Sequence, residues 1–364
     1  MNADEILRFA GGEAFAVDPD AIERELASLW QAAGQENSKA APVTRACLLN
    51  VIALLEEREG LEGFGSADRL QSWIDELPRY VAARALVVRS QPFQMGQDEL
   101  QSWISANCII AGSGGKLVCS EEVTIAARGS GDHHVPGLVR ALLVPGLPTN
   151  LLVRGVPHGA LAEPLLQLAD RVVSDVDASS HQRPLRTLAR RVKEGQHRLM
   201  DMGWVGTAGL RAALAGAFDP PFDGDSLMRV QRLRCATPPH AQWSSRLVLG
   251  WLTRAIGAEQ IDPSYVGPPD TTRFVRPSGP ALDIEVQVDP SLPGPRFIFE
   301  AEAWSEPVQV SSLGTHVEVT GPHLPTTRRP RQELDGPAGL ARALVNRAED
   351  TAFHDASEIA ERLP

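Results

Sequence analysis

The first half of the chain alternates short apolar runs with amphipathic helical patterns. Residues 18–30 place Ile22, Leu26 and Leu29 on one side of a predicted helix. Residues 66–80 predict a second helix, which begins at a capping serine and ends near Pro78. Between them, residues 47–55 are apolar except for Asn50, a pattern that favours a strand buried on both faces, although the leucines also allow a helix.

The alternation continues to residue 218. We predict strands at 84–90, 103–112, 117–129, 150–155 and 171–175, helices at 136–144 and 160–169, and a long helical stretch at 184–218. The four residues 113–116 between two of these strands are typical of a hairpin turn. Strands that alternate with helices indicate an α/β layered domain with a mixed, largely parallel sheet and one hairpin.

The alternation of strands and helices ends at residues 219–226, a segment rich in proline and glycine that we interpret as a linker. We predict strands at 227–236, 272–276, 282–288, 296–301, 308–311 and 316–319, with helices at 243–256, 338–348 and 352–362. Asp283, Glu285 and Gln287 alternate with apolar residues, which indicates an antiparallel sheet with one solvated face. The chain is therefore predicted to form an N-terminal α/β domain at 1–218 and a C-terminal α+β domain at 227–364.

Composition and charge narrow the function classes. The 364 residues are 43% hydrophobic and 22% charged, with a net charge of −11, and this acidic balance disfavours nucleic acid and anionic membranes as partners. The N-terminal residues lack the basic start and apolar stretch of a signal peptide, and no segment approaches the length needed to span a bilayer. Four cysteines do not suggest a secreted disulfide framework. We therefore expect a cytoplasmic protein.

The usual catalytic and cofactor motifs are incomplete. Gly60, Gly63 and Gly65 precede a predicted helix, but their spacing is not that of a dinucleotide-binding loop. The residues around Lys116 lack the full phosphate-loop frame, and no G-x-S-x-G motif occurs. His133 and His134 are adjacent, so they do not converge on one metal ion. We expect no catalytic residues, no metal and no cofactor.

One carboxylate interrupts an apolar row. In the strand at 117–129, alternation places Glu121 on the same face as Cys119 and Val123. A buried carboxylate requires a partner, and Arg84, Arg89 and Arg128 are the candidates. The residue is either part of a structural ion pair or a contact to a ligand or partner protein.

The hairpin also brings two cysteines together. A turn centred on residues 113 and 114 pairs Cys108 directly with Cys119. In a reducing cytosol both are expected to act as small buried hydrophobic residues, with a redox switch as the alternative.

Eight segments, in this order, carry a family resemblance: IERELASLW, TRACLLNVI, RALVVRSQP, VCSEEVTIAARG, VRALLVPGLPTNLLVRG, ADRVVSD, DMGW with LRAALAGAFD, and RLVLGWLTRAIG. Over roughly 21–257 the chain resembles the OpcA family of glucose-6-phosphate dehydrogenase assembly proteins. The resemblance implies an N-terminal α/β domain, a C-terminal domain, no catalytic activity, no cofactor and the dehydrogenase as partner. Among the positions that match the family pattern, the candidates for partner or ligand binding are Arg45, Asn50, Glu121, Arg171, Asp175, Asp201, Trp204 and Arg211.

The chain also departs from the family pattern. Gly146 replaces an acidic residue, Val153 and Arg154 replace paired tryptophans, and Leu210 replaces a further tryptophan. The resemblance therefore implies a divergent member that promotes assembly or allosteric activation of the dehydrogenase in the oxidative pentose phosphate pathway. The alternative is an enzyme or sensor that binds a nucleotide or sugar phosphate at the carboxyl ends of its parallel strands.

Overall fold

The computed structural model describes residues 12–36, 43–45, 47–56, 66–91, 99–111, 116–155, 160–176, 198–219, 227–258, 260–322, 324–331, 334, 336–346 and 350–364. Contacts divide the chain into unit 1 (Met1–Ala178, Thr187–Leu199 and Leu340–Asn346) and unit 2 (Ser179–Arg186, Met200–Gly339 and Arg347–Pro364). The main boundary between the two compact units thus lies near residue 199, whereas the sequence predicts a domain boundary between residues 218 and 227. The division into folding domains at that boundary stays a prediction.

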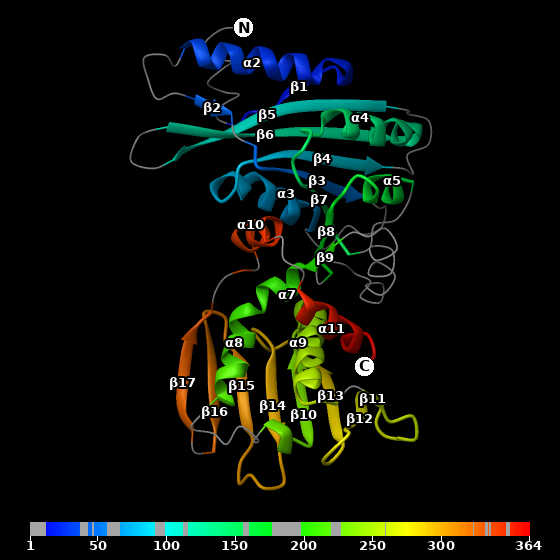
Figure 1. Ribbon diagram of the computed structural model, residues 1–364, viewed down its shortest axis with the longest axis vertical. Coiled ribbons are helices and arrows are strands. Elements are labelled where there is room, and N and C mark those ends of the chain that lie inside the picture. The colour runs from blue at the N-terminus through cyan, green and yellow to red at the C-terminus, as the bar shows by residue number, and fades with distance from the viewer. Residues whose placement is uncertain are drawn as a thin grey trace. The chain divides into compact units, whose positions relative to one another are not determined.

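Unit 1 is built on a mixed sheet (Figure 1). Its described strands are β1 (Phe15–Val17), β2 (Val43–Arg45), β3 (Leu49–Glu56), β4 (Ala83–Gln91), β5 (Glu99–Ala111), β6 (Lys116–Arg128), β7 (Thr149–Val153), β8 (Arg171–Ser174) and β9 (Arg198–Asp201). They follow the order β1-β5-β6-β4-β3-β7-β8-β9, and β2 pairs with β6. The pairs β2–β6, β6–β4, β4–β3, β3–β7 and β7–β8 are parallel, whereas β1–β5 and β5–β6 are antiparallel.

Helices cover both faces of this sheet. The described helical segments are η1 (Pro19–Ala21), α2 (Ile22–Glu36), α3 (Ser66–Glu76), η3 (Leu77–Arg79), η4 (Gly129–His134), α4 (Val135–Leu142), α5 (Ala162–Leu166) and α10 (Pro337–Val345). Side chains of α2 and the end of α4 contact the face that carries Arg84, while α3 contacts the opposite face through Gln71. Strand β3 is therefore buried on both sides, which is why Leu49–Leu55 form an almost unbroken apolar run.

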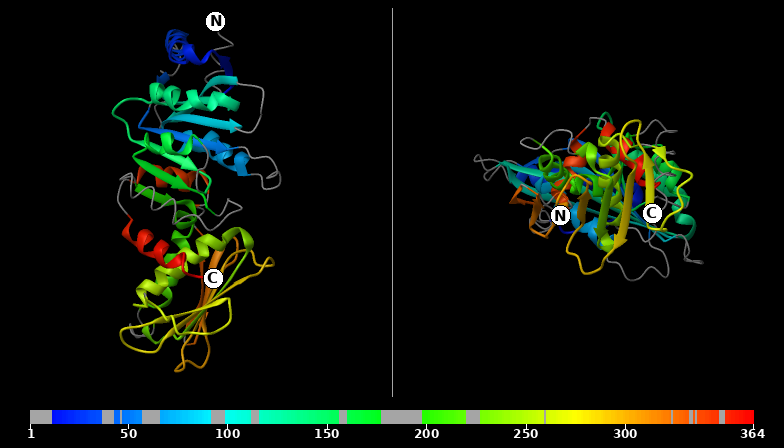
Figure 2. Two further views of the ribbon diagram at one scale, coloured as in Figure 1. Left: turned by 90° about the vertical axis from the view of Figure 1, so that its right-hand side faces the viewer. Right: turned by 90° about the horizontal axis from the view of Figure 1, so that it is seen from below.

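Unit 2 packs helices against one face of a second sheet (Figure 2). Its described elements are α7 (Met202–Gly206), α8 (Ala208–Ala217), η5 (Leu227–Arg229), β10 (Arg232–Thr237), η6 (Pro239–Ala241), α9 (Gln242–Ala255), β11 (Gln260–Ile261), β12 (Thr271–Val275), β13 (Leu282–Val288), β14 (Arg296–Glu300), β15 (Val308–Ser312), β16 (His316–Gly321), β17 (Leu324–Pro330) and α11 (Thr351–Ala360). The strand order is β11-β12-β13-β10-β14-β15-β16-β17. Phe274, Phe297 and Phe299 fill the core under α8 and α9, while Arg273 and Asp283 form an ion pair on the other face.

The predicted fold class is confirmed: unit 1 has a mixed, largely parallel sheet with one hairpin, and unit 2 is an α+β unit. The strand interpretation of 47–55 is correct, and so is the predicted hairpin register, since Cys108 pairs with Cys119. The second sheet is antiparallel except that β10 and β13 run parallel.

Two local predictions differ from the structure, and two others fall on residues that it does not describe. The predicted helix at 184–218 is interrupted, because Arg198–Asp201 form the edge strand β9 and two separate helices follow; residues 177–197 lie outside the described part. The strand predicted at 227–236 begins only at Arg232, after a 3₁₀ turn. The glycines at 60, 63 and 65 and the linker residues 220–226 lie outside the described residues.

Candidate functional site

A buried ion pair lies at the centre of the predicted site in unit 1. The Arg84 side chain is 3% exposed and the Glu121 side chain 2%, and the guanidinium contacts Glu121 Oε2 at 2.7 Å through its terminal nitrogen and 2.8 Å through Nε. The pair forms because β4 and β6 are parallel neighbours whose register places Arg84 beside Glu121. Of the three arginines proposed from the sequence, Arg84 is therefore a partner of this carboxylate.

Other elements complete the coordination of both charges. The indole N–H of Trp30, on α2, donates to Glu121 Oε1. Arg84 also donates to Glu23 on α2 and to the backbone carbonyl of Leu142 at the end of α4, the latter at 2.7 Å. Burial by itself lowers the pKa of the Arg84 guanidinium, but the charges and hydrogen bonds of Glu121 and Glu23 outweigh it and raise that pKa. This arginine stays charged and joins two helices to the sheet.

Asn50 fixes the turn between α4 and β7. Its side-chain nitrogen donates to the Val144 carbonyl at 3.1 Å and to Thr149 Oγ1 at 3.3 Å, and its side-chain oxygen accepts from the Val144 N–H at 3.0 Å. The side chain is completely buried in the middle of the sheet. An amide suits this position because it both donates to and accepts from the backbone of the turn.

The remaining predicted residues of unit 1 also make contacts within the unit. Arg171 donates to the carbonyls of Ala343 and Asn346 at the end of α10, where the helix leaves carbonyl groups without partners. Asp175, buried just after β8, forms an ion pair with Arg69 of α3 at 2.5 Å. Arg45 lies on β2 in register with Cys119.

Three further predicted residues lie on successive elements, Asp201 at the end of β9, Trp204 on α7 and Arg211 on α8. Asp201 caps α7 by accepting a hydrogen bond from the Gly203 N–H at 2.9 Å. The Trp204 indole N–H donates to Asp350 at 2.7 Å, and the Arg211 guanidinium lies 3.5 Å from the centre of the Trp204 ring. Arg211 also donates to the Trp204 carbonyl at 2.5 Å. Trp204 and Arg211 thus contact each other across the turn between α7 and α8, while Asp201 fixes the start of α7.

The cysteines occupy different environments. Cys108 and Cys119 form a disulfide across the β5–β6 hairpin, whereas Cys47 and Cys235 are free. Burial raises the pKa of the Cys235 thiol to about 12 and also raises that of Cys47, so neither thiol is activated as a nucleophile. The redox role suggested for the pair stays a prediction.

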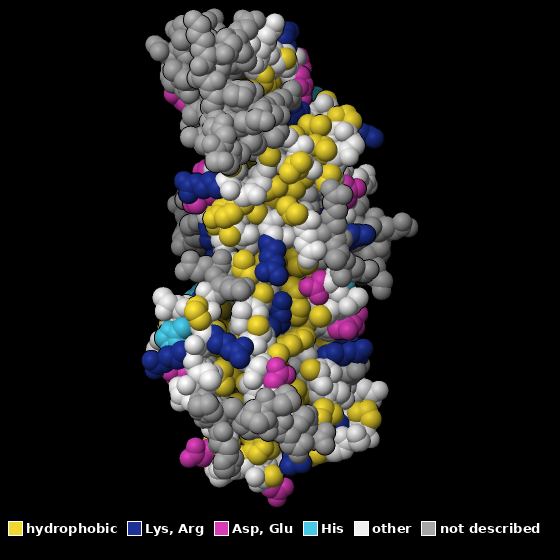
Figure 3. Space-filling view, turned by 60° about the vertical axis from the view of Figure 1, so that its left-hand side comes forward, with side chains coloured by type: hydrophobic (Ala, Val, Ile, Leu, Met, Phe, Trp, Pro, Cys, Tyr) yellow, Lys and Arg dark blue, Asp and Glu magenta, His cyan; other side chains and the backbone are white. Residues whose placement is uncertain are grey.

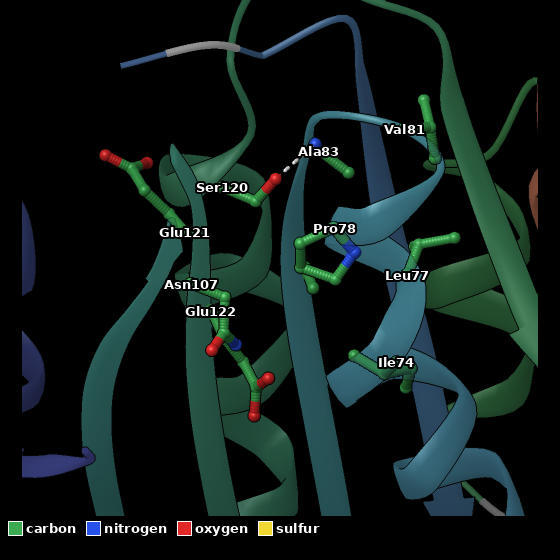
Figure 4. Close-up of a pocket in the computed structure, with 10 residues that line it drawn as sticks. Ile74, Leu77, Pro78, Val81, Ala83, Asn107, Ser120, Glu121 and Glu122 are labelled. Atoms are coloured by element: carbon green, nitrogen blue, oxygen red, sulfur yellow. Dashed lines mark hydrogen bonds between the residues drawn. The ribbon is translucent and has the colours of Figure 1, made fainter. Parts of the chain in front are cut away.

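The structure also shows a hollow that sequence reasoning missed (Figure 4). It measures about 240 Å³ including its open side, and it is lined by Ile74, Leu77, Pro78, Val81, Ala83, Ala85, Asn107, Ser120, Glu121 and Glu122. The Glu121 carboxylate points away from Pro78, toward the opposite face of the sheet (Figure 4). The proline after a predicted helix marked its end, but nothing in the sequence indicated that β5 and β6 would lie opposite it.

Glu122 brings an acidic group to this hollow. Its Oε1 accepts hydrogen bonds from Gln71 Nε2 and Thr124 Oγ1, both at 3.3 Å, and the same Gln71 nitrogen donates to Asp75 at 2.8 Å. Burial, together with the nearby Asp75 carboxylate, raises the pKa of Glu122. The two carboxylates thus share one neutral amide.

The part of the chain that the structure describes contains neither a metal-binding cluster nor a membrane-spanning helix. No group of three or more His, Cys, Asp or Glu residues there is arranged to hold a metal ion. None of the helices described is long and apolar enough to cross a membrane.

Two family models match the chain in succession. Residues 75–193 match the model described as glucose-6-phosphate dehydrogenase subunit N-terminal domain, and residues 197–357 match the corresponding C-terminal domain. Together they cover most of the chain. No curated protein shows detectable sequence similarity to it.

Several solved structures show a partial similarity to the chain. A dehydrogenase from Chromobacterium violaceum is 11% identical with a TM-score of 0.46, covering 87% of this chain and 94% of its own. An oxidoreductase from Sinorhizobium meliloti is 12% identical with a TM-score of 0.46, covering 87% and 89%. Biliverdin reductase from Synechocystis sp. PCC 6803 is 12% identical with a TM-score of 0.45, covering 86% and 97%. Similarity at this level does not bear on the chemistry of the chain.

Proposed function

We propose, because the chain belongs to the OpcA family of glucose-6-phosphate dehydrogenase assembly proteins, that it is a non-catalytic accessory protein that binds this dehydrogenase and promotes its assembly or allosteric activation. The observation that carries the proposal is the match of both family domains, in order, across residues 75–357. The proposed role places the protein in the cytoplasm with its partner enzyme.

The contacts of the family-pattern residues support a non-catalytic role. Asn50, Glu121, Arg171 and Asp201 are all buried and bound to other groups of the chain. Residues held in this way stabilise the two units. Whether any of them also contributes to partner binding stays a prediction.

The acidic sequence between β3 and α3 argues against the alternative function. The strand order β6-β4-β3-β7-β8 is that of a doubly wound sheet. In such sheets phosphate groups bind where the chain leaves the central strand for the next helix, which corresponds here to the connection between β3 and α3. The connecting residues 57–65 include Glu57, Glu59 and Glu62 against a single basic residue, Arg58. By composition alone, this excess of acidic residues disfavours the binding of a pyrophosphate or sugar phosphate.

Activation by such a protein requires a difference in affinity. A binding partner shifts an equilibrium between enzyme states only by as much as it prefers one of them, and a tenfold preference corresponds to about 1.4 kcal/mol. The effect on the dehydrogenase should therefore saturate with occupancy of a defined complex.

The test combines the purified protein with the dehydrogenase of the same organism. We expect light scattering to show a larger assembly and the dehydrogenase rate to rise until the two proteins are near equimolar. No complex and no change of rate at tens of micromolar would contradict the proposal. Stabilisation by NADP⁺ or glucose 6-phosphate in a thermal unfolding assay, in place of complex formation, would favour the alternative.

A further inference from the structure

Two large hydrophobic side chains are exposed to solvent at the amino ends of β3 and β4. Leu48, just before β3, is 62% exposed, and Tyr80, just before β4, is 53% exposed. The Leu48 N–H donates to the Ala82 carbonyl, so the two exposed side chains lie on adjacent segments. Among the described residues of unit 1, the only other large hydrophobic side chain with comparable exposure is Val345. Figure 3, which brings these strand ends forward, shows hydrophobic side chains gathered on the surface.

The hollow adjoins this exposed edge. Pro78 lies at its centre in Figure 4, two residues before Tyr80, and the floor is formed by Asn107 and Ser120 on neighbouring strands. The same face of the sheet continues along β5 and β6 to the half-buried Trp103, which pairs with Thr124. Tyrosine and tryptophan side chains are enriched at the centres of protein interfaces.

The polar part of the hollow favours a cation. Glu122 Oε2 accepts no hydrogen bond from the described residues, and the neighbouring Asp75 carboxylate adds negative charge. The nearby Arg89 already donates to Gln71 Oε1 at 2.9 Å. A positively charged group of a partner would therefore gain electrostatic energy here, and it would relieve the repulsion between the two carboxylates.

We propose that the hollow and the adjoining Tyr80 form a docking surface for a segment of the dehydrogenase that carries an apolar side chain next to a lysine or arginine. This inference rests on the proposed function and adds to it a surface and a type of partner sequence. The surface lies at the amino ends of the parallel strands, opposite the edge where doubly wound folds bind small ligands. That position suits a protein partner.

The experiment measures the dissociation constant of the full-length protein and the dehydrogenase by biolayer interferometry. Tyr80→Ala removes the exposed ring, and Glu122→Gln removes the charge while keeping the shape of the side chain. The matched controls are Val266→Ser, a change at a 97% exposed apolar position of unit 2, and Glu163→Gln, a change at an exposed carboxylate of α5. Circular dichroism verifies that each variant is folded.

We expect Tyr80→Ala to weaken binding by about tenfold or more, as a central interface residue does. Glu122→Gln should weaken it by about threefold or more and reduce its dependence on salt, because a charge pair has been lost. Both controls should bind as the unsubstituted protein does. If the unsubstituted protein binds and these two variants bind equally well, the docking surface is wrong while the proposed function stands. If the unsubstituted protein does not bind, the proposed function fails and the docking surface fails with it.

Discussion

The buried pair of Arg84 and Glu121 gives the sharpest quantitative prediction. Arg84→Met keeps most of the side-chain volume but removes the guanidinium that pairs with the buried Glu121 carboxylate. It also removes the donor to the Leu142 carbonyl. Removing one partner of a buried ion pair costs about 3–5 kcal/mol, because the remaining charge stays buried without its counter-charge.

This cost is large on the scale of protein stability. With a urea dependence of about 2 kcal/mol per molar, a loss of 3–5 kcal/mol lowers the unfolding midpoint of unit 1 by about 1.5–2.5 M. The control is Arg79→Met, which removes the ion pair with Glu76 on the surface of the same unit, where the side chains are 68% and 42% exposed. An exposed pair contributes about 0–1 kcal/mol, so its midpoint should fall by at most about 0.5 M.

The double variant Arg84→Met with Glu121→Leu measures how much of the loss comes from leaving one charge buried without its counter-charge. It removes both charges, so its loss of stability should fall short of the sum of the two single losses by about 2–3 kcal/mol. Urea unfolding followed by circular dichroism gives the midpoints, and hydrogen exchange at β4 and β6 assigns the transition to unit 1. The reasoning is refuted if Arg84→Met is no more harmful than Arg79→Met, or if the double loss equals the sum.

Three further predictions concern single features. Folding raises the pKa of Glu122 above its ordinary value of 4.5, so the unfolded chain loses this proton at a lower pH than the folded chain does. The contribution of Glu122 to the free energy of unfolding therefore declines as the pH rises from 4.5 to the raised pKa of the folded state. Glu122→Gln should therefore raise the urea midpoint at pH 7, with the gain vanishing near pH 4; an equal gain at both pH values would contradict this. The Cys108–Cys119 bond closes a loop across 11 residues of sequence, which corresponds to about 3 kcal/mol of chain entropy, so dithiothreitol should lower the midpoint of unit 1 but not that of Cys108→Ser. If the pair is also a redox switch, reduction should change the activation of the dehydrogenase. Gly250→Ala should lower the melting temperature, because a Cβ there overlaps the Ala356 carbonyl of α11; a rise, as expected from helix propensity alone, would show that the helices can separate.

Local patterns were enough to predict most of the elements. Residues 49–55 are apolar except for Asn50 because β3 has neighbours on both sides and helices on both faces, and this burial is visible in the sequence itself. The hairpin register follows from the turn position, so the opposition of Cys108 and Cys119 could be predicted by counting residues. The short strands β2 and β11 were missed because two or three residues carry no detectable periodicity.

The failure at residues 184–218 has a different cause. Helix-forming residues dominate this stretch, yet Arg198–Asp201 form an edge strand in which Leu199, Met200 and Asp201 are buried. The energy that favours a strand here comes from pairing with a sheet whose other strands are distant in sequence. Propensity within the segment does not include that energy.

The candidate site was likewise predictable only in part from the sequence. The sequence alone required that Glu121, in an apolar row, have a positively charged or N–H-donating partner, because an isolated carboxylate is too costly to bury. Only the tertiary structure selected Arg84, since the parallel register of β4 and β6 places it beside Glu121, and only the packing of α2 supplied Glu23 and the Trp30 indole. The hollow beside Tyr80 could not be predicted, because its walls come from α3, η3, β4, β5 and β6, which meet only in the folded chain. Local chemistry states which groups need partners, and the long-range contacts of the fold decide which groups those partners are.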